Sequence, residues 1–585
     1  MLFKASKILH LLLLSCPLAQ GDTSLRGALV YKQQGTDEQE HTIRSTGSIR
    51  HLSTDHNYFA PLSCNADLDV SKCYTTTTAG STTLSSILNN DSDTSTSDEV
   101  LIPCGTCVVV DTIDGSTVDI PFGLNVEGML YFPSSANVTI QTPHIFVQGK
   151  LKMDPPASTS SSSNSIRIRM VGEEDQYLHP HEENAASCDE GTGCKVGKKA
   201  IVVAGGQLDI NGLHDSDCPS FSHLKAMPSA TQIQVESTNN DDPPVLIQGF
   251  GVGLSPVLES HTTTAADCWG VGDEILITNS KGAVRGWSHQ LVRTISAIDK
   301  NTGTFTLSDA IGDGDSPITT ASNPNFASEV ASLSRKIIFE AEGDGPSDGD
   351  IPLHGGHLMI FNTADVAQRL EGVEIRNFGQ QGNLGRYPIH FHMSNRVTGS
   401  IVRKNVIRES KQRCVVIHGS HDVTVEDNVA FDSYGHCYML EDGAEIDNTF
   451  IGNLGARTRS ISKAETLLEK ATDNFASTFW ITNTQNHFIG NVAAGSTFSG
   501  FWFELRAVRG DSAALYPDVF PRNLPLYTFR ENTSHSNQDM GTYQTASLSS
   551  FFIPSTTSFA YTQLQFISLF VRQSGRVRFK FQTRY

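Results

Sequence analysis

One pattern occurs four times in the sequence: Val402-Arg-Lys-Asn-Val406, Val425-Glu-Asp-Asn-Val429, Phe450-Ile-Gly-Asn-Leu454 and Phe488-Ile-Gly-Asn-Val492. The asparagines are 23, 25 and 38 residues apart, and the longest gap contains a polar stretch, 457–474, that predicts a loop inserted into one coil. Apolar runs that recur every ~20 to 30 residues without helical periodicity are typical of a β-solenoid. The asparagines suit a tight corner, because Asn tolerates left-handed geometry and its amide can bond to the next coil. We therefore assign them to structure.

A similar succession of short strands is predicted nearer the N-terminus. From Val100 onward, apolar runs such as Val108–Val110 and Val138–Ile140 alternate with glycines and turn residues. No segment between residues 100 and 149 has helical periodicity, so this region is also predicted to be all-β.

The first residues have the features of a secretory signal peptide. Lys4 and Lys7 precede an apolar run, Ile8–Leu14, and small residues follow at 17–21. We expect cleavage near Ala19 to Gly21, secretion, and no membrane span, because no later segment approaches about 20 apolar residues.

Cysteine usage agrees with an oxidising compartment. Eleven cysteines include Cys16 in the signal peptide, which leaves an even number. Three pairs are close enough in sequence for local disulfides, and Cys414 and Cys437, one coil apart, suit either a disulfide or a buried thiol ladder. The three local pairs are Cys64/Cys73, Cys104/Cys107 and Cys188/Cys194. Glycosylation sequons stand at Asn90, Asn137 and Asn532.

The net charge is −20, which makes nucleic acid a poor partner. One stretch opposes this charge: between Arg386 and Arg413 there are seven basic residues and one acid, Glu409. We interpret it as an electropositive groove for an acidic sugar chain rather than as a solvated face.

Histidines are concentrated in the same region and are followed by two acids. In the segment Ile389-His-Phe-His392 the histidines alternate with apolar residues, so His390 and His392 both face outward if Ile389 and Phe391 face the core. His418 lies 26 residues after His392, and Asp442 lies 24 after His418, so these side chains can occupy neighbouring coils about 4.8 Å apart.

Three roles are open for this cluster. His390, His392, His418 and Asp442 could ligate a divalent metal, and a His with a carboxylate could act as acid and base on a glycosidic bond. The third role is a structural histidine ladder. Two parity arguments complicate the chemistry: His418 points inward if Cys414 does, and the adjacent Glu441 and Asp442 point opposite ways. A second acid would then come from another coil, with Asp422, Glu426 and Asp432 as candidates.

Three blocks of this region resemble a known family. They are Leu384–Met393, Arg413–Ser420 and Gly435–Gly443, and they are similar to the central β-helix of the cell-migration-inducing and cell-surface hyaluronidases and the fibrocystin-like receptors. Upstream, Gly123, Gly128, Gly149 and Gly205–Gly212 are similar to the eight-glycine domain of that family.

The resemblance implies an all-β chain: a right-handed parallel β-helix preceded by an eight-glycine β domain. Its parts are expected to be a signal peptide (1–20), a flexible Ser/Thr-rich arm (21–98), the eight-glycine domain (99–225), a β segment (226–355), the β-helix core (356–545) and an atypical tail (546–585). The tail has no coil repeat, and a wrongly predicted or truncated gene end is one explanation of it.

The family offers two functions. One is a secreted glycosidase acting on an acidic glycosaminoglycan-like polysaccharide, and the alternative is a non-catalytic adhesion or matrix-binding protein of fibrocystin type. A pectinase- or alginate-lyase-like enzyme ranks third, because the paired aspartates of β-helix pectin hydrolases are not evident. For the enzyme we expect catalytic roles for His392, His418, Glu441 and Asp442, and substrate contacts from Arg386, Tyr387, Arg413 and Trp480.

Overall fold

The structure is a computed structural model that describes most of residues 61–544, together with strands at 551–553, 562–564 and 577–578. The gaps are 66–67, 74–81, 91–98, 158–163, 179–193, 216, 237–262, 280–285, 323–326, 362, 469–470 and 539. The predicted signal peptide, Cys188 and the side chain of Asn90 lie outside the described residues. No helix in the described part is long and apolar enough to cross a bilayer.

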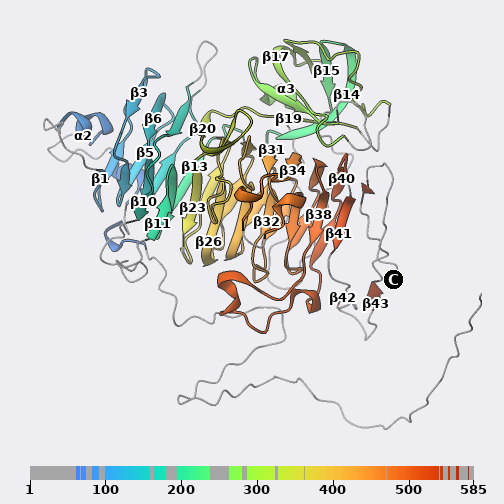
Figure 1. Ribbon diagram of the computed structural model, residues 1–585. Helices are drawn as coiled ribbons and strands as arrows, with labels where there is room; N and C mark the ends of the chain where they lie inside the picture. Colours follow the sequence, from blue (N-terminus) through green and yellow to red (C-terminus); the bar gives the residue numbers. More distant parts are fainter. Residues whose placement is uncertain are drawn as a thin grey trace, which may run out of the picture. The chain divides into compact units, whose positions relative to one another are not determined.

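The main body is a parallel β-helix, as expected from the sequence. Each coil contributes one strand to each of three long sheets, which stack coil upon coil from blue to red in Figure 1. Sheet 1 consists of β1 (Val100–Ile102), β4 (Leu124–Val126), β7 (His144–Val147), β12 (Ala200–Ala204), β23 (His357–Phe361), β26 (Ile389–Arg396), β29 (Val415–His421), β32 (Tyr438–Leu440), β35 (Ser477–Ile481), β38 (Ser499–Phe503) and β41 (Met540–Gln544).

The other two sheets follow the same order. Sheet 2 consists of β2 (Cys107–Val109), β5 (Met129–Phe132), β8 (Lys150–Met153), β13 (Gln207–Asn211), β24 (Arg369–Glu371), β27 (Ile401–Arg403), β30 (Thr424–Glu426), β33 (Thr449–Ile451), β36 (His487–Ile489) and β39 (Thr528–Arg530). Sheet 3 consists of β3 (Thr117–Asp119), β6 (Val138–Thr142), β9 (Ile166–Met170), β20 (Ile337–Ala341), β25 (Val373–Arg376), β28 (Val406–Arg408), β31 (Val429–Tyr434), β34 (Leu454–Arg459), β37 (Val492–Ser496), β40 (Thr533–His535) and the antiparallel β44 (Val577–Arg578).

Inward-facing side chains from all three sheets form one continuous apolar core. Aromatic rings stack from coil to coil inside it: Phe450 lies 4.8 Å from Phe488, and Phe479 lies 4.7 Å from Phe501, measured between ring centroids. Stacked rings bury large apolar areas with favourable geometry, which helps to fix the register of successive coils.

The repeated asparagines form a buried ladder at the corner between sheets 2 and 3. The side-chain amide of Asn405 donates to Asn428 Oδ1 (3.0 Å), that of Asn428 to Asn453 Oδ1 (2.9 Å), and that of Asn453 to Asn491 Oδ1 (2.9 Å). Asn532 adds a fifth rung, because it accepts from Asn491 at 3.0 Å. The predicted bonding from coil to coil is therefore confirmed.

The prediction that the asparagines themselves adopt left-handed geometry is wrong, because the left-handed residue is the one before each asparagine. Positive φ falls on the residue before each rung: Lys404, Asp427, Gly452, Gly490 and Glu531, with φ between 50° and 64°. The preceding residue makes the turn, and the asparagine satisfies the backbone groups that the turn exposes.

The solenoid begins earlier than expected. Strands β7 and β12, from the predicted eight-glycine domain, pair in parallel with each other, and β12 pairs with β23 of the predicted helix core. The two predicted β domains are therefore coils of one solenoid. Glycines allow this stacking where backbones approach closely: a Cβ on Gly149 would lie 1.9 Å from the Gly128 carbonyl oxygen.

Part of the predicted flexible arm covers the first coil. It includes the helices α1 (Val70–Cys73) and α2 (Leu84–Asn90), and Leu84 packs into the solenoid core. The sequence left the disulfide connectivity open; in the structure disulfides join Cys64 to Cys104 and Cys73 to Cys107, not the cysteines that are neighbours in sequence. Cys414 and Cys437 do form a disulfide between adjacent coils.

A closed barrel is inserted between β13 and β20. It consists of β14 (Phe221–Ser229), β15 (Gln232–Val235), β16 (Glu274–Ile277), β17 (Leu291–Asp299), β18 (Thr304–Leu307) and β19 (Glu329–Ser332), with α3 (Ala265–Cys268) beside them. The barrel packs against the outer face of sheet 3 through Leu276, Ala331 and Leu333. A disulfide between Cys218 and Cys268 joins α3 to the segment just before β14. The barrel thereby covers sheet 3 at β28, β31, β34 and β37.

Three antiparallel hairpins complete the described strands. They are β10 (Gln176–Leu178) with β11 (Cys194–Gly197), β21 (Asp344–Asp348) with β22 (Ile351–His354), and β42 (Phe551–Ile553) with β43 (Thr562–Leu564). The last pair lies in the predicted tail and does not continue the parallel coils.

Candidate functional site

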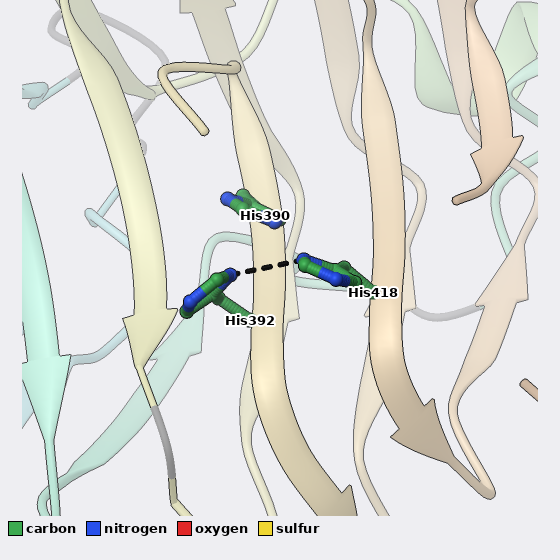
Figure 2. A group of neighbouring side chains, drawn as sticks. All are labelled: His390, His392 and His418. Carbon is green, nitrogen blue, oxygen red and sulfur yellow. Dashed lines mark hydrogen bonds between the residues drawn. The ribbon is translucent and has the colours of Figure 1, made fainter. Parts of the chain in front are cut away.

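The histidines gather on the outer face of sheet 1, on strands β26 and β29. Ile389 and Phe391 point into the core, so His390 and His392 point outward, as the alternation predicts. His392 is in register with His418 on the next coil. Figure 2 shows the three imidazoles lying together, two from one strand and one from its neighbour.

His418 also faces outward, so the inward orientation inferred from Cys414 is wrong. Val415 and Ile417 point into the core with Cys414, which breaks strict alternation. The reason is that β29 begins at Val415, and the corner residue Arg413 has φ of 60°. Alternation holds only within a strand, and Cys414 lies before this one.

Glu441 and Asp442 both turn towards the histidines, so the prediction that they point apart is wrong as well. Strand β32 ends at Leu440, and the two acids lie in the following turn. Asp442 Oδ2 lies 2.8 Å from His418 Nε2, and Glu441 Oε2 lies 3.9 Å from both His390 Nε2 and His418 Nδ1. The alternative acids are elsewhere: Asp422 pairs with Arg396, and Asp432 with Arg459.

Neighbouring groups fix the orientation of each of these side chains. His390 Nδ1 lies 2.8 Å from the Gly385 carbonyl, and His392 Nδ1 lies 3.0 Å from His418 Nδ1. Glu441 Oε1 accepts hydrogen bonds from Arg413 (2.8 Å) and from the Tyr387 hydroxyl (3.3 Å). The cluster is therefore preorganised.

Burial and neighbouring charges give the three imidazoles different pKa values. Desolvation lowers the pKa of His390 well below its ordinary value and that of His392 to about 3. Burial opposes charge on His418 too, but its bond to Asp442 and the charge of Glu441 raise its pKa to about 9. Burial would raise the pKa of Glu441, and the positive charges of Arg413 and His418 outweigh it and bring that pKa down to about 2.

A pocket of about 350 Å³ opens over this cluster. Its floor consists of His390, His392, His418, Glu441 and Asp442. Val196, Met359, Phe361 and Leu384 supply an apolar wall, and Gly510 and Asp511 form part of the rim. A concave site with an apolar wall and a few convergent polar groups is the usual form of a ligand site.

The rim residues come from a segment that the repeat pattern did not identify. Residues 504–527 leave the solenoid between β38 and β39 and include short 3-10 helices at Gly510–Ala513 and Pro521–Asn523. The Ser512 backbone N–H donates to Asp442 Oδ2 at 3.0 Å, and Asp511 is exposed at the pocket. The only signal in the sequence was the long interval between repeats.

The predicted substrate-binding residues are mostly buried. Tyr387 and Arg413 are 0% and 3% exposed, and Arg413 pairs with Glu441 (2.8 Å) and Asp473 (3.3 Å). Trp480 is 3% exposed and packs on His436, with ring centroids 4.1 Å apart. Arg386 hydrogen-bonds Gln380 and lies 3.6 Å from Asp175. Tyr387 and Arg413 hold Glu441, and Trp480 lies on the outer face of sheet 1, where it packs with Leu468 and Trp502.

The predicted electropositive groove does not form. A stretch of about one coil winds around the solenoid, so its basic residues point from different sheets. Arg403 pairs with Glu371, Arg408 with Glu274, and Lys404 lies 3.7 Å from Asp427. Neither Lys nor Arg is among the pocket residues within the described part of the chain.

Asn532 is 0% exposed, and its amide donates to the Phe488 carbonyl at 2.9 Å. A glycan on this nitrogen is incompatible with the ladder. Asn137 is partly buried, and its side-chain oxygen accepts from the Ser165 N–H at 3.1 Å. Glycosylation of Asn137 stays a prediction.

Comparison with known families confirms the resemblance. Residues 353–542 match the family described as CEMIP beta-helix, and residues 88–225 match the G8 domain. These matches cover the site strands and the early coils of the solenoid, respectively.

Curated relatives match parts of the chain. A G8 domain-containing protein of Dictyostelium discoideum is 27% identical over 75% of this chain and 27% of its own length. Two Homo sapiens proteins, cell surface hyaluronidase CEMIP2 (32% identical) and cell migration-inducing and hyaluronan-binding protein (33%), match 37% of this chain and 18% of their own lengths. The chain thus spans about a quarter or less of these relatives.

Among solved structures, a double mutant of the periplasmic alginate epimerase AlgG is 8% identical, with a TM-score of 0.17, over 79% of this chain and 80% of its own. At this score the likeness carries no argument.

Proposed function

We propose that this protein is a secreted enzyme that cleaves an acidic, hyaluronan-like polysaccharide in the pocket over β26, β29 and β32. The observation that carries the proposal is the convergence of three imidazoles and two carboxylates on the floor of one pocket. The names of two relatives, a cell surface hyaluronidase and a hyaluronan-binding protein, supply the substrate class. Secretion is supported by the disulfides.

Hydrolysis adds the hydroxyl of water to the sugar carbon and returns a proton to the departing glycosidic oxygen. Glycosidases usually use two carboxylates that are free of other partners. Glu441 and Asp442 do not provide such a pair. Arg413 and Tyr387 hold Glu441, whereas His418 and the Ser512 N–H hold Asp442. We therefore assign the reacting centre to His392, His418, Glu441 and Asp442 acting as one cluster. We assign proton exchange with the glycan to Asp511, which lines the pocket and is exposed there.

The test uses the purified full chain with fluorescent hyaluronan, and with neutral dextran as a comparison, followed by size-exclusion analysis of chain length. We expect hyaluronan to be shortened and dextran to survive. His392→Gln should lower the rate by at least ~100-fold, the usual worth of a group in the reacting centre. His487→Gln is the matched control, because His487 lies on β36 of sheet 2 and bonds Thr528 at 3.0 Å.

Retention of hyaluronan without shortening would instead support the adhesion or matrix-binding alternative. Equal cleavage of dextran would contradict the acidic substrate class. Equal rates in His392→Gln and His487→Gln would contradict the assignment of the pocket.

A further inference from the structure

We propose that His390, His392, His418 and Glu441 form a binding site for one divalent transition-metal ion of the zinc class. This differs from the set expected from the sequence, in which Asp442 was the carboxylate ligand. Any use of the ion in glycan cleavage rests on the function proposed above, whereas its binding does not.

The donor atoms have the spacing that a metal requires. One ring nitrogen from each histidine lies within 4.8 Å of the others (Figure 2). His392 Nδ1 and His418 Nδ1 are 3.0 Å apart, and Glu441 Oε2 lies 3.9 Å from His418 Nδ1 and from His390 Nε2. Nitrogens bound tetrahedrally to zinc at about 2.05 Å lie about 3.3 Å from one another, a value between these distances.

Two buried atoms that face this point have no hydrogen-bond partner among the described residues. They are His390 Nε2 and Glu441 Oε2, and His390 is only 1% exposed. A buried polar atom without a partner is unfavourable, because it has lost its hydrogen bonds to water and gained none in the protein. A purely structural histidine ladder would carry that cost twice, at atoms on the same side of the cluster, whereas a bound cation would remove both costs.

The groups behind the donors aim them at the same point. The Gly385 carbonyl accepts from His390 Nδ1, which leaves the Nε2 lone pair free to bind a metal. Asp442 accepts from His418 Nε2, which leaves Nδ1. Arg413 and Tyr387 occupy Glu441 Oε1, which leaves Oε2. A carbonyl or carboxylate behind a ligating histidine, and hydrogen bonds to a ligating carboxylate, are the usual support of a protein metal site.

The donor set selects the class of metal. Three imidazoles and one carboxylate suit zinc and its first-row neighbours, whereas calcium and magnesium prefer oxygen ligands. His392 is partly exposed at the pocket, so an ion can enter from that side. A bound ion would also bring positive charge to a pocket with no Lys or Arg in its described lining.

The test is calorimetric titration of the chelator-treated full chain with Zn²⁺, with Co²⁺ absorption as a report on coordination. We expect one ion per chain. His392→Gln should weaken binding by at least ~100-fold, because it removes a ligand, and His487→Gln should bind as the unmodified chain does. Asp442→Asn should weaken binding by ~10–100-fold with the stoichiometry kept, since Asp442 only orients His418.

Circular dichroism of each variant separates loss of binding from loss of fold, and Asp442→Asn serves if His392→Gln does not fold. Absence of zinc binding, or equal affinity in His392→Gln and His487→Gln, would overturn the metal site. Zinc binding without hyaluronan cleavage would uphold the site and overturn the proposed function. Cleavage by a chain that binds no zinc would do the reverse.

Discussion

The asparagine ladder and the histidine cluster are both polar groups stacked on successive coils, but they differ in how their atoms are satisfied. Asn453 donates to Asn491 and to the Val425 carbonyl, and it accepts from the side chain and backbone N–H of Asn428. In the histidine cluster, His390 Nε2 and Glu441 Oε2 are buried without a partner in the described part of the structure. The side chain of Asn453 in the ladder has partners for its donors and its acceptor, whereas the cluster leaves converging donor atoms available to a ligand.

This difference gives a way to distinguish structural repeats from sites. Repetition of a polar residue predicts stacking in both cases, because a solenoid places equivalent positions above one another. Whether every atom has a partner then separates a scaffold from a site, since buried unpaired groups are costly and persist mainly where a function uses them.

The largest effect should come from breaking the ladder at its centre. Asn453→Ala removes four hydrogen bonds and leaves their buried partners unpaired, so we expect the free energy of unfolding to fall by on the order of 4 kcal/mol. Urea unfolding measures it. His392→Gln should change stability by less than ~1 kcal/mol without added metal, and an equal loss in both variants would contradict the distinction.

The next effect concerns His436, a histidine with both nitrogens partnered. Its Nδ1 accepts from the Ser477 N–H at 3.2 Å, its Nε2 lies 3.1 Å from Thr472 Oγ1, and burial lowers its pKa to about 4. Below pH ~6.5 the unfolded chain takes up a proton that the folded chain refuses until about pH 4. The contribution of the neutral His436 to the free energy of unfolding is therefore complete above pH 6.5. It falls by about 3 kcal/mol as the pH drops towards 4.

Unfolding free energies measured from pH 7.5 to 4.5 test this expectation. His436→Gln should lose stability less steeply with falling pH than the unmodified chain. Parallel curves would show that His436 is not held neutral by the fold.

A smaller effect should follow from adding zinc. At free Zn²⁺ 100 times the dissociation constant, binding to the folded state alone stabilises it by about 2.7 kcal/mol. We expect a rise in melting temperature in the unmodified chain and in His487→Gln, with no rise in His392→Gln. A rise in all three would mean that zinc acts elsewhere.

The smallest change concerns glycosylation, which tests the asparagine ladder and not the histidine cluster. Because Asn532 is a buried rung, Asn532→Gln should leave the glycan mass of the chain unchanged, whereas Asn137→Gln should lower it. Mass spectrometry before and after enzymatic removal of N-glycans decides this. A glycan found on Asn532 would show that the last rung does not form in the glycosylated protein.

Periodicity in the sequence was enough to predict the features that repeat. The solenoid, the stacking of asparagines and the outward side chains of His390 and His392 all result from regular spacing within strands and between coils. The same reasoning failed at the corners, because residues before and after a strand do not alternate. Arg413 and Glu441 lie at such positions, which is why the faces of His418 and Asp442 were inferred wrongly.

The ion pairs and the N-terminal disulfides could not be derived for a related reason. Residues that are close in sequence, such as Arg396, Arg403 and Arg408, lie at different positions around one coil and meet acids from distant segments. The pairings of Cys64 and Cys73 likewise depend on how the N-terminal segment folds over the first coil. Spacing along the chain contains no information on either contact.

The rim of the pocket is built from 504–527, a segment outside the repeat, while its floor is built from the repeat itself. The two parts meet at Asp442, whose Oδ2 accepts from the Ser512 backbone N–H. Lengthening the excursion outside residues 510–513 would reshape the entrance and leave the stacked strands in place. Proteins that share the same floor can in this way differ in the ligands that they admit.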